Sequence, residues 1–232
     1  MQLFYHPSIE MGKTVVCEHD ESKHLKALRM KDGDRVLLTD GKGKRFIAAI
    51  EWKKYDAHLT PLDSESVPPF SPALTLAIAP TKNADRLEWF VEKAVEIGVS
   101  KIILVHCENA ERPIVKLERL QRVAISAMKQ SLKFYLPEIT ALVSFKTLLA
   151  EHHSGMKCIA HCADDAEKKL LKNILPKGSD ALICIGPEGD FSAAEVALAK
   201  QNGFLACSLG NSRLRTETAG MAAVHTFDLI QQ

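Results

Sequence analysis

The sequence has little of several features that would mark a special class of protein. Lys plus Arg number 30 and Asp plus Glu number 29 among 232 residues, so the formal net charge is only +1. A charge this small gives no overall field that would draw the chain to nucleic acid or membrane, so any basic surface must be local. The sequence also has no run of about 18 apolar residues, which a membrane-spanning helix requires. It shows no signal peptide pattern, and we expect a cytoplasmic protein.

Cysteines are few, and their spacing argues against a metal centre. The six include no Cys-x-x-Cys pair, and four have apolar neighbours: Cys17, Cys107, Cys184 and Cys207. We expect reduced thiols in a core. Cys158 and Cys162 lie near His161, but residues 157–162 have the pattern of a strand, on which His161 and Cys162 face opposite sides. No metal is therefore expected, and the nine histidines are interpreted as structural or exposed.

What is present is a change of pattern along the chain. Residues 64–72 contain Pro68, Pro69 and Pro72, which cannot continue a helix or a central strand, so this segment is predicted to be a linker. Before it, short β-type segments at 35–39, 45–52 and 57–62, with a glycine-rich turn and one helix near 22–29, predict a small barrel. The chain therefore begins with a small β-rich domain.

After the linker, apolar strand patterns alternate with amphipathic helix patterns. Strands are expected at 74–79, 102–105, 158–160, 181–185 and 204–209. Helices are expected around 87–98, 117–128, 192–203 and 216–230, with a helical stretch between the strands at 158–160 and 181–185. This alternation predicts a parallel sheet covered on both faces. Its first strand-to-helix turn, residues 79–85, has neither Gly-x-Gly-x-x-Gly nor Gly-Lys-Ser/Thr, which argues against a Rossmann site and a P-loop.

Two later loops, each at the carboxyl end of an expected strand, are candidates for a ligand site. The first is Gly186-Pro187-Glu188-Gly189-Asp190, in which two glycines let the backbone approach a ligand. The second runs from Leu209-Gly210 to Arg215-Thr216-Glu217-Thr218-Ala219. Together with the segments at 24–34, 85–99, 130–131 and 137–139, these loops resemble the RsmE-type family of ribosomal RNA methyltransferases. That family belongs to the knotted SPOUT class and methylates N3 of a uridine in 16S ribosomal RNA with S-adenosylmethionine.

The resemblance implies a PUA-like RNA-binding β-barrel domain at 1–68 and a SPOUT α/β domain with a trefoil knot at 73–232. The cofactor is expected to be held mainly by backbone groups of seven residues: Gly186, Glu188, Gly189, Leu209, Gly210, Leu214 and Thr216. The chain departs from the family pattern at Asp190, where the family often has glycine, and at Arg213, which is displaced by one position. A further departure is Lys133, a cation without the planar fork of arginine.

Methylation at N3 requires loss of a proton from uracil, and the resemblance suggests which residues assist. A cation near O2 or O4 would stabilise the anion, and a carboxylate could accept the proton. Arg215 is the candidate for the first role, and Glu217 or Glu188 for the second. Glu217 has an alternative explanation, since an acidic residue in the first turn stabilises a helix.

The resemblance also suggests the partners of the chain. Six cations are candidates for RNA contact: Arg29, Lys42, Lys44, Arg45, Arg86 and Lys133. Members of the family are homodimers through the second domain, and the apolar last helix fits such an interface. Two alternatives remain open: a non-catalytic RNA-binding or ribosome-assembly protein, and a SPOUT enzyme that methylates another position, such as a ribose 2′-hydroxyl.

Changing Lys42, Lys44 and Arg45 together to Glu is expected to weaken RNA binding and flatten its salt dependence. Each lost phosphate contact removes about 0.7 from the slope of log affinity against log salt for a single strand. Fluorescence anisotropy with a 16S ribosomal RNA fragment at several salt concentrations measures both quantities. An unaltered affinity would favour the alternative that these residues only protect a solvated hairpin edge.

Overall fold

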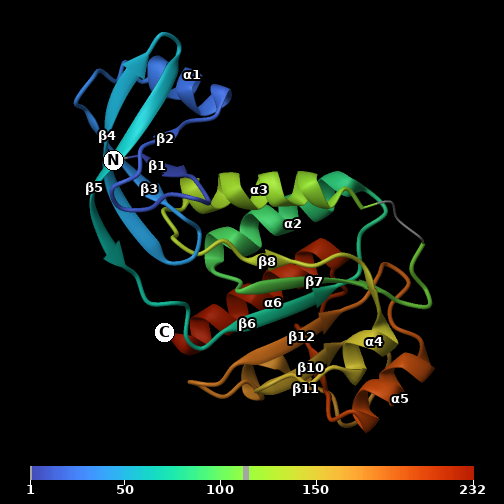
Figure 1. The fold of residues 1–232 in the computed structure, drawn as a ribbon. Coiled ribbons are helices and arrows are strands. Elements are labelled where there is room, and N and C mark those ends of the chain that lie inside the picture. The colour runs from blue at the N-terminus through green and yellow to red at the C-terminus, as the bar shows by residue number, and fades with distance from the viewer. Residues whose placement is uncertain (1, 112–114) are drawn as a thin grey trace. The chain divides into compact units, whose positions relative to one another are not determined.

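The computed structural model describes residues 2–111 and 115–232, in which the chain forms two units (Figure 1). Unit 1 comprises the chain up to Pro69 together with Ile125–Leu136, and unit 2 comprises Phe70–Ala124 and Pro137–Gln232. Met1, with which the predicted first domain begins, lies outside the described residues. The expected order of a small β-rich part followed by an α/β part is confirmed.

Unit 1 is built on one mixed, curled sheet of five strands in the order β1-β3-β4-β5-β2. These strands are β1 (Leu3–Tyr5), β2 (Val15–Val16), β3 (Arg35–Thr39), β4 (Lys44–Lys53) and β5 (Asp56–Ser66). Strand β1 pairs with β3 in parallel, and the other pairs are antiparallel. A register shift between Ile47 and Ala48 interrupts the β4–β5 pairing, and such a bulge increases the local twist of a sheet.

The core of unit 1 follows from alternation along these strands. Phe46, Ile50 and Leu59 are buried, while their strand neighbours are more exposed, as the period of two in a half-buried strand requires. Helix α1 (His19–Ala27) adds Leu25, which is fully buried in the same apolar cluster. One face of the sheet is thereby removed from water, which stabilises the unit through the hydrophobic effect.

A segment distant in sequence completes unit 1. The amide of Gly43 donates to the carbonyl of Phe134 over 2.9 Å, and the amide of Leu136 donates to the carbonyl of Gly41 over 2.8 Å. Tyr135 forms a β-bridge with Lys42 between these two bonds. The glycine-rich turn after β3 is therefore fixed by residues more than 90 positions away, which local sequence patterns do not reveal.

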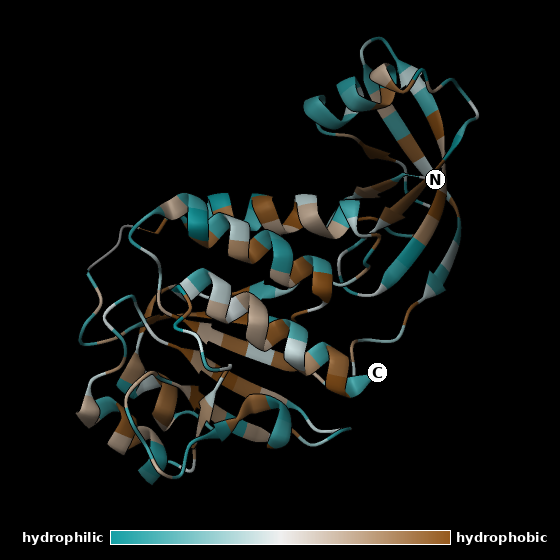
Figure 2. Cartoon of the chain, turned by 180° about the vertical axis from the view of Figure 1, so that it is seen from behind, coloured by the Kyte–Doolittle hydropathy of each residue, from teal (hydrophilic) through white to brown (hydrophobic). Residues whose placement is uncertain are grey.

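Unit 2 contains one parallel sheet in the order β11-β13-β10-β12-β6-β7-β8, with β9 also beside β7. Its strands are β6 (Leu74–Ile78), β7 (Lys101–His106), β8 (Glu138–Ile139), β9 (Val143–Ser144), β10 (Met156–Ala160), β11 (Lys169–Leu170), β12 (Ala181–Ile185) and β13 (Leu205–Ser208). All residues of β12 are buried, as expected for a central parallel strand covered on both faces. The central strands are correspondingly hydrophobic in Figure 2.

Helices cover both faces of this sheet (Figure 1). They are α2 (Ala84–Ile97), α4 (Phe145–Ala150), α5 (Ala193–Gln201) and α6 (Thr216–Gln231), while α3 (Leu117–Gln130) runs from unit 2 into unit 1. Helix α6 packs on α2, β6 and β12. At Gly220 a Cβ atom would lie 2.7 Å from the ring of Phe90 and 2.9 Å from Ile78, so a glycine allows this close approach.

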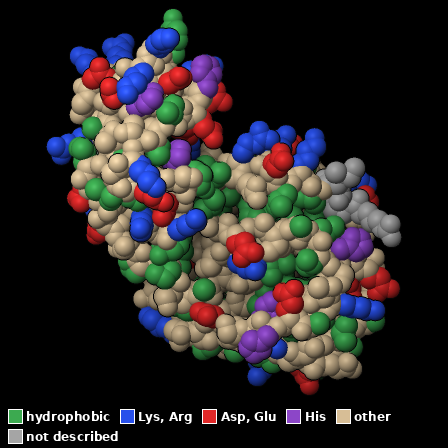
Figure 3. Space-filling view, viewed as in Figure 1, with side chains coloured by type: hydrophobic (Ala, Val, Ile, Leu, Met, Phe, Trp, Pro, Cys, Tyr) green, Lys and Arg blue, Asp and Glu red, His purple; other side chains and the backbone are tan. Residues whose placement is uncertain are grey.

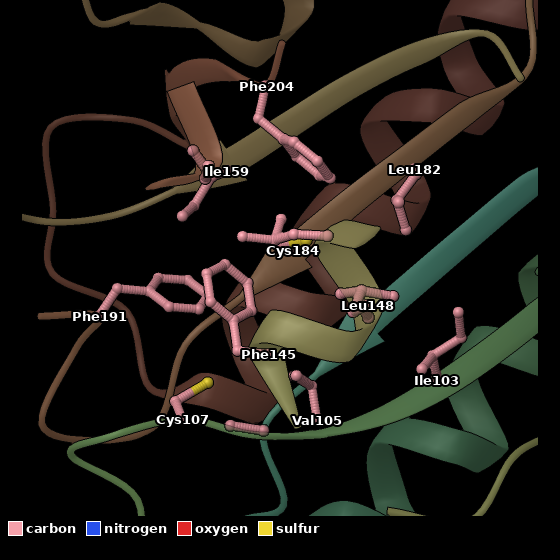
Figure 4. Packing of buried hydrophobic residues seen from close by; sticks show 14 residues of the cluster. Ile103, Val105, Cys107, Phe145, Leu148, Ile159, Leu182, Cys184, Phe191 and Phe204 are labelled. Carbon is pink, nitrogen blue, oxygen red and sulfur yellow. The ribbon is translucent and has the colours of Figure 1, made fainter. Parts of the chain in front are cut away.

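The opposite face of the sheet packs against α4 and α5. Ala77 and Ala79 flank Ile78 in sequence and point to the other side, where they join Phe145, Phe191 and other buried residues (Figure 4). The rings of Phe145 and Phe191 lie 4.9 Å apart between centroids. Phe191 immediately follows the first candidate loop, so this core anchors the loop's end.

Several sequence-based expectations are wrong in detail. Ser64–Ser66, predicted to be linker, belong to β5, where they pair with β4. The helical stretch expected between β10 and β12 is instead β11 and one 3₁₀ turn, η1 (Leu171–Asn173). Strand β10 ends at Ala160, so His161 and Cys162 lie beyond it rather than on opposite faces of a strand. In the described part of the chain, no helix is both long and apolar enough to cross a membrane.

Substitution Gly43→Ala is expected to lower the free energy of unfolding by about 2–5 kcal/mol. Gly43 has φ of 96°, and a Cβ atom there would lie 2.1 Å from the hydroxyl oxygen of Tyr135. Left-handed backbone strain and overpacking therefore both contribute to the loss of stability. Gly33→Ala is the matched control, because Gly33 has φ of 84° with nothing within 4 Å of its Cβ position, and only about 1–2 kcal/mol should be lost. Urea denaturation measures both, and equal losses would contradict the packing argument.

Candidate functional site

The two candidate loops meet at the carboxyl edge of the parallel sheet of unit 2. Strand β10 lies between β12 and β13, so the segments that follow these three strands are neighbours. They enclose a cavity of about 790 Å³. Its walls are Ala160, His161, Cys162, Lys168, Ile185, Gly186, Pro187, Glu188, Asp190, Cys207, Ser208, Leu209, Gly210, Asn211, Ser212, Arg213, Leu214, Arg215, Thr216 and Ala219. Cavities of this size hold drug-sized ligands.

A hydrogen bond between buried groups joins the two loops. The hydroxyl of Thr216, the first residue of α6, donates to the carbonyl of Gly186 over 3.1 Å. A second, weaker contact is made by the guanidinium of Arg213, which lies 3.4 Å from the carbonyl oxygen of Glu188. Because Thr216 and Gly186 are both buried, an unmade bond would leave a carbonyl without a partner inside the protein.

The first loop turns sharply before α5. The amide of Asp190 donates to the carbonyl of Pro187 over 2.9 Å, and Asp190 has φ of 62°. Ser192 and Glu195 then form a capping box at the start of α5, as their spacing in the sequence predicts. The left-handed backbone at Asp190 explains why glycine suits this position. Aspartate tolerates the same conformation better than most other residues.

The side chain of Asp190 also has a role that glycine could not supply. One carboxylate oxygen accepts a hydrogen bond from the amide of Cys162 over 2.7 Å, and the other accepts from the amide of Phe191 over 2.9 Å. Asn109 holds the same loop from outside, donating from its side-chain amide to the carbonyls of Gly189 and Asp190 over 3.2 Å each. The segment after β10 is thereby tied to the loop after β12.

Six of the seven residues predicted to hold a cofactor line the cavity. Gly186 and Thr216 are buried, Leu209 and Leu214 are half-buried, and Glu188 and Gly210 are exposed. Gly189 is not part of the wall. A Cβ atom at Gly189 would lie 3.1 Å from Cβ of Asn109, so its small size serves the packing of the loop.

The predicted catalytic residues lie in different surroundings. Arg215 and Glu188 both line the cavity and are exposed to solvent. Glu188 accepts a hydrogen bond from the amide of Lys82 over 3.3 Å. Glu217 is outside the cavity wall, 7% exposed, with Oε1 at 3.7 Å from Nε of Arg86. Within the described residues, its other carboxylate oxygen has no hydrogen-bond partner.

The cations predicted to bind RNA are divided between the units. Arg29, Lys42 and Lys44 are exposed in unit 1, and Lys133 lies two residues from Tyr135, which bridges Lys42. Arg45 pairs with Glu65 on the neighbouring strand. Arg86 belongs to unit 2 and pairs with Glu217. In Figure 3, further Lys and Arg side chains gather on unit 1 around the β4–β5 turn.

Other residues of the cavity wall were missed by reasoning from the sequence. His161 and Lys168 line the cavity, because the segment that follows β10 contributes a third wall. A histidine directly after an apolar strand was the available signal, but the strand was expected to extend through it. Cys207 also lines the wall, where a hydrogen bond with Cys158 and, after it, burial raise the pKa of its thiol well above the usual range. In residues 2–111 and 115–232, no group of three or more His, Cys, Asp or Glu side chains is arranged to hold a metal ion.

Two family models match the chain. The model of an RNA methyltransferase domain matches residues 69–228, and that of an RNA methyltransferase PUA domain matches residues 17–54. Among curated proteins, the ribosomal RNA small subunit methyltransferase E of Bacillus subtilis is 28% identical and covers 93% of this chain and 90% of its own length. The protein of the same name from Rickettsia conorii is 30% identical, with 85% of this chain and 81% of its own length covered.

Solved structures agree with this similarity. A probable rRNA methyltransferase from Porphyromonas gingivalis is 43% identical with a TM-score of 0.93, covering 100% of this chain and 98% of its own. A ribosomal RNA small subunit methyltransferase E from Neisseria gonorrhoeae, bound to S-adenosylmethionine, is 30% identical with a TM-score of 0.84 and the same coverage. The fold described above is thus the fold of S-adenosylmethionine-binding relatives.

Substitution Thr216→Val is expected to lower the free energy of unfolding by about 1–3 kcal/mol, because it leaves the buried carbonyl of Gly186 without its donor. Thr216→Ser keeps the hydroxyl and is the matched control, with an expected loss of less than half as much. Thermal and urea unfolding of the ligand-free protein measure the difference. If valine and serine have the same effect, the bond between the loops contributes little to stability.

Proposed function

The chain belongs to the ribosomal RNA small subunit methyltransferase E family, and on this premise we propose that it transfers the methyl group of S-adenosylmethionine to N3 of a uridine in 16S ribosomal RNA. The observation that carries the proposal is the enclosure of one cavity by the loops after β12 and β13. These are the two loops whose sequences resemble the family most specifically.

We place S-adenosylmethionine in this cavity. Its volume of about 790 Å³ suits a nucleoside with an amino-acid side chain, and most of its lining residues belong to the loops after β12 and β13. Gly210 supports this placement, because it has φ of 142° and leaves open space where a Cβ atom would stand. Gly186, Leu209, Leu214 and Thr216 would complete the enclosure, with Gly189 supporting the first loop from behind.

The proposed mechanism assigns a charge role to Arg215. The bound cofactor supplies an electrophilic methyl group on a sulfonium sulfur. Uracil N3 carries a proton and becomes a nucleophile when that proton leaves, so a cation near O2 or O4 favours the reaction. Arg215 lines the cavity, and none of the described residues engages its guanidinium in a hydrogen bond or ion pair. Its charge is therefore available to a substrate.

Of the two carboxylates, we propose Glu188 as the proton acceptor. Glu188 is exposed on the cavity wall, where a base can reach a uracil that enters from solvent. Glu217 is buried, lies outside the wall and faces Arg86. We assign Glu217 a positioning role, in which this residue of the first turn of α6 orients Arg86 of α2. The acidic residue in that turn also stabilises the helix.

We further propose the division of labour and the assembly that the family resemblance implies. Residues 1–68 form the RNA-binding domain, whose basic surface includes Lys42 and Lys44, and Lys133 adds to this surface from the segment Ile125–Leu136 of unit 1. Residues 73–232 form the knotted catalytic domain, and α6 contributes to a homodimer interface. Leu229 on this helix is 56% exposed, as expected for an apolar side chain that a second copy could cover. We expect the protein to act in the cytoplasm.

Nucleoside analysis tests the proposed reaction. The purified protein, S-adenosylmethionine and unmodified small ribosomal subunits or 16S ribosomal RNA are incubated, and the RNA is digested and analysed by mass spectrometry. N3-methyluridine is the expected product. A ribose-methylated nucleoside would contradict the proposal and show that the chain is a SPOUT enzyme that methylates another position. If calorimetry detects no heat of binding when S-adenosylmethionine is added to the protein, a non-catalytic RNA-binding protein is favoured.

Substitution Arg215→Ala is expected to lower the rate of methyl transfer at least about 100-fold, the usual effect of removing a group that stabilises developing charge. The affinity for S-adenosylmethionine should stay within a few-fold, because the cofactor is proposed to be held mainly by backbone groups. Single-turnover assays and calorimetry measure the two effects. Lys177→Ala is a control for loss of a cation, since Lys177 is exposed before β12 and the cavity follows the other end of that strand. Unchanged transfer by Arg215→Ala would remove Arg215 from the mechanism.

A further inference from the structure

His161 is the buried polar side chain of the cavity wall whose ring is left without a hydrogen bond. Its side chain is 2% exposed, and it lines the cavity immediately after β10. Among the residues that the structure describes, neither Nδ1 nor Nε2 of His161 has a hydrogen-bond partner. Nε2 lies 3.5 Å from a carboxylate oxygen of Asp165, a distance that constitutes an ion pair only if the imidazole is protonated. A buried imidazole without partners is costly unless a ligand supplies them.

The charged groups around His161 are already engaged with other partners. Lys168 donates to the carbonyls of His161, Cys162 and Ala163, the last over 2.6 Å. Asp190 accepts from two backbone amides, as described above. Asp165 pairs with Lys200 over 2.7 Å and accepts from the amide of Glu167 over 3.0 Å. Within the described residues these charged groups have other partners, whereas the buried imidazole has none.

The same neighbours decide the charge of the ring. Burial and the ammonium of Lys168 lower the pKa of His161 below its ordinary value, with a smaller contribution from Lys200, while Asp190 and Asp165 oppose this effect only in part. The ring is therefore uncharged at neutral pH, with one nitrogen as a donor and the other as an acceptor. A neutral imidazole can donate from one nitrogen and accept at the other, and the hydroxyls of a ribose and the nitrogens of an adenine offer matching acceptors and donors.

We propose that His161, as a neutral imidazole, hydrogen-bonds to an uncharged polar group of the nucleoside part of S-adenosylmethionine, a ribose hydroxyl or an adenine nitrogen. His161 is then a specificity-determining residue for the cofactor rather than a structural histidine. This inference rests on the proposed location of the cofactor in this cavity. A second substitution, which fills the cavity at a position away from His161, is needed to test the location of the cofactor separately from the role of His161.

Calorimetry with two ligands tests the assignment. The ligands are S-adenosylmethionine and 5′-methylthioadenosine, which keeps the nucleoside and lacks the amino-acid part. His161→Leu should weaken both about tenfold, which corresponds to one lost hydrogen bond. His161→Gln, which can donate and accept, should retain both affinities within about threefold. The unfolding temperature of the ligand-free protein should not fall in the leucine variant, because no hydrogen bond within the described protein is lost.

The outcomes distinguish the failures. If His161→Leu weakens the affinity for S-adenosylmethionine alone, the contact is with the amino-acid part and the proposal is overturned. Equal losses of affinity in the leucine and glutamine variants, or no loss in either, would also overturn it. Ala219→Phe fills the cavity from α6. If it abolishes binding while His161→Leu does not, only the inference about His161 is wrong. If neither substitution affects binding, the cofactor lies elsewhere and the proposed site is wrong.

A pH titration of the unmodified protein gives a second test that needs no leucine variant. The affinity for 5′-methylthioadenosine is measured from about pH 8 to about pH 5. Because the pKa of His161 lies below the ordinary value, the affinity should be constant near neutrality and fall only in the acid part of this range, when the ring gains a proton and loses its acceptor. The His161→Gln variant should show no such fall. The same fall in both proteins would assign the titration to another group and overturn the inference.

Discussion

The site depends on one constraint of the parallel sheet, the position of β10 between β12 and β13. Because all three strands run in the same direction, their carboxyl ends lie at one edge, and the three segments that follow them must share the space beyond it. The buried bond from Thr216 to Gly186 then fixes two of these segments to each other. A different strand order would separate the same loops, and no cavity would form between them.

Hydrogen bonds to backbone groups hold the loops after β10 and β12 at their turning points. Asp190 satisfies two amides and adopts a left-handed backbone conformation, while Asn109 satisfies two carbonyls on the outer side. The end of the loop after β12 is held by the packed core around Phe145 and Phe191 (Figure 4). A preorganised wall of this kind reduces the ordering that a ligand would have to impose on binding.

Charged side chains act locally in this protein, because the nearly balanced composition gives no overall field. The net charge of +1 conceals an exposed basic turn at Lys42 and Lys44 in unit 1, next to a segment that carries Lys133. In unit 2, Arg86 is paired with a buried glutamate, so its charge is partly neutralised, whereas Arg215 remains available at the cavity. Cations that look equivalent in a sequence therefore differ in what they can bind, because their neighbours differ.

The sequence by itself determined the two-part organisation, most helices and strands, and the two loops at 186–190 and 209–219, since these follow from local periodicity and glycine spacing. Only the tertiary structure decided that Leu136 bonds to Gly41, that Glu217 faces Arg86 outside the cavity, and that His161 stands on the cavity wall. Each of these depends on pairing between segments far apart in the chain. Local patterns specify which face of an element is apolar, but they do not specify which distant segment will cover it.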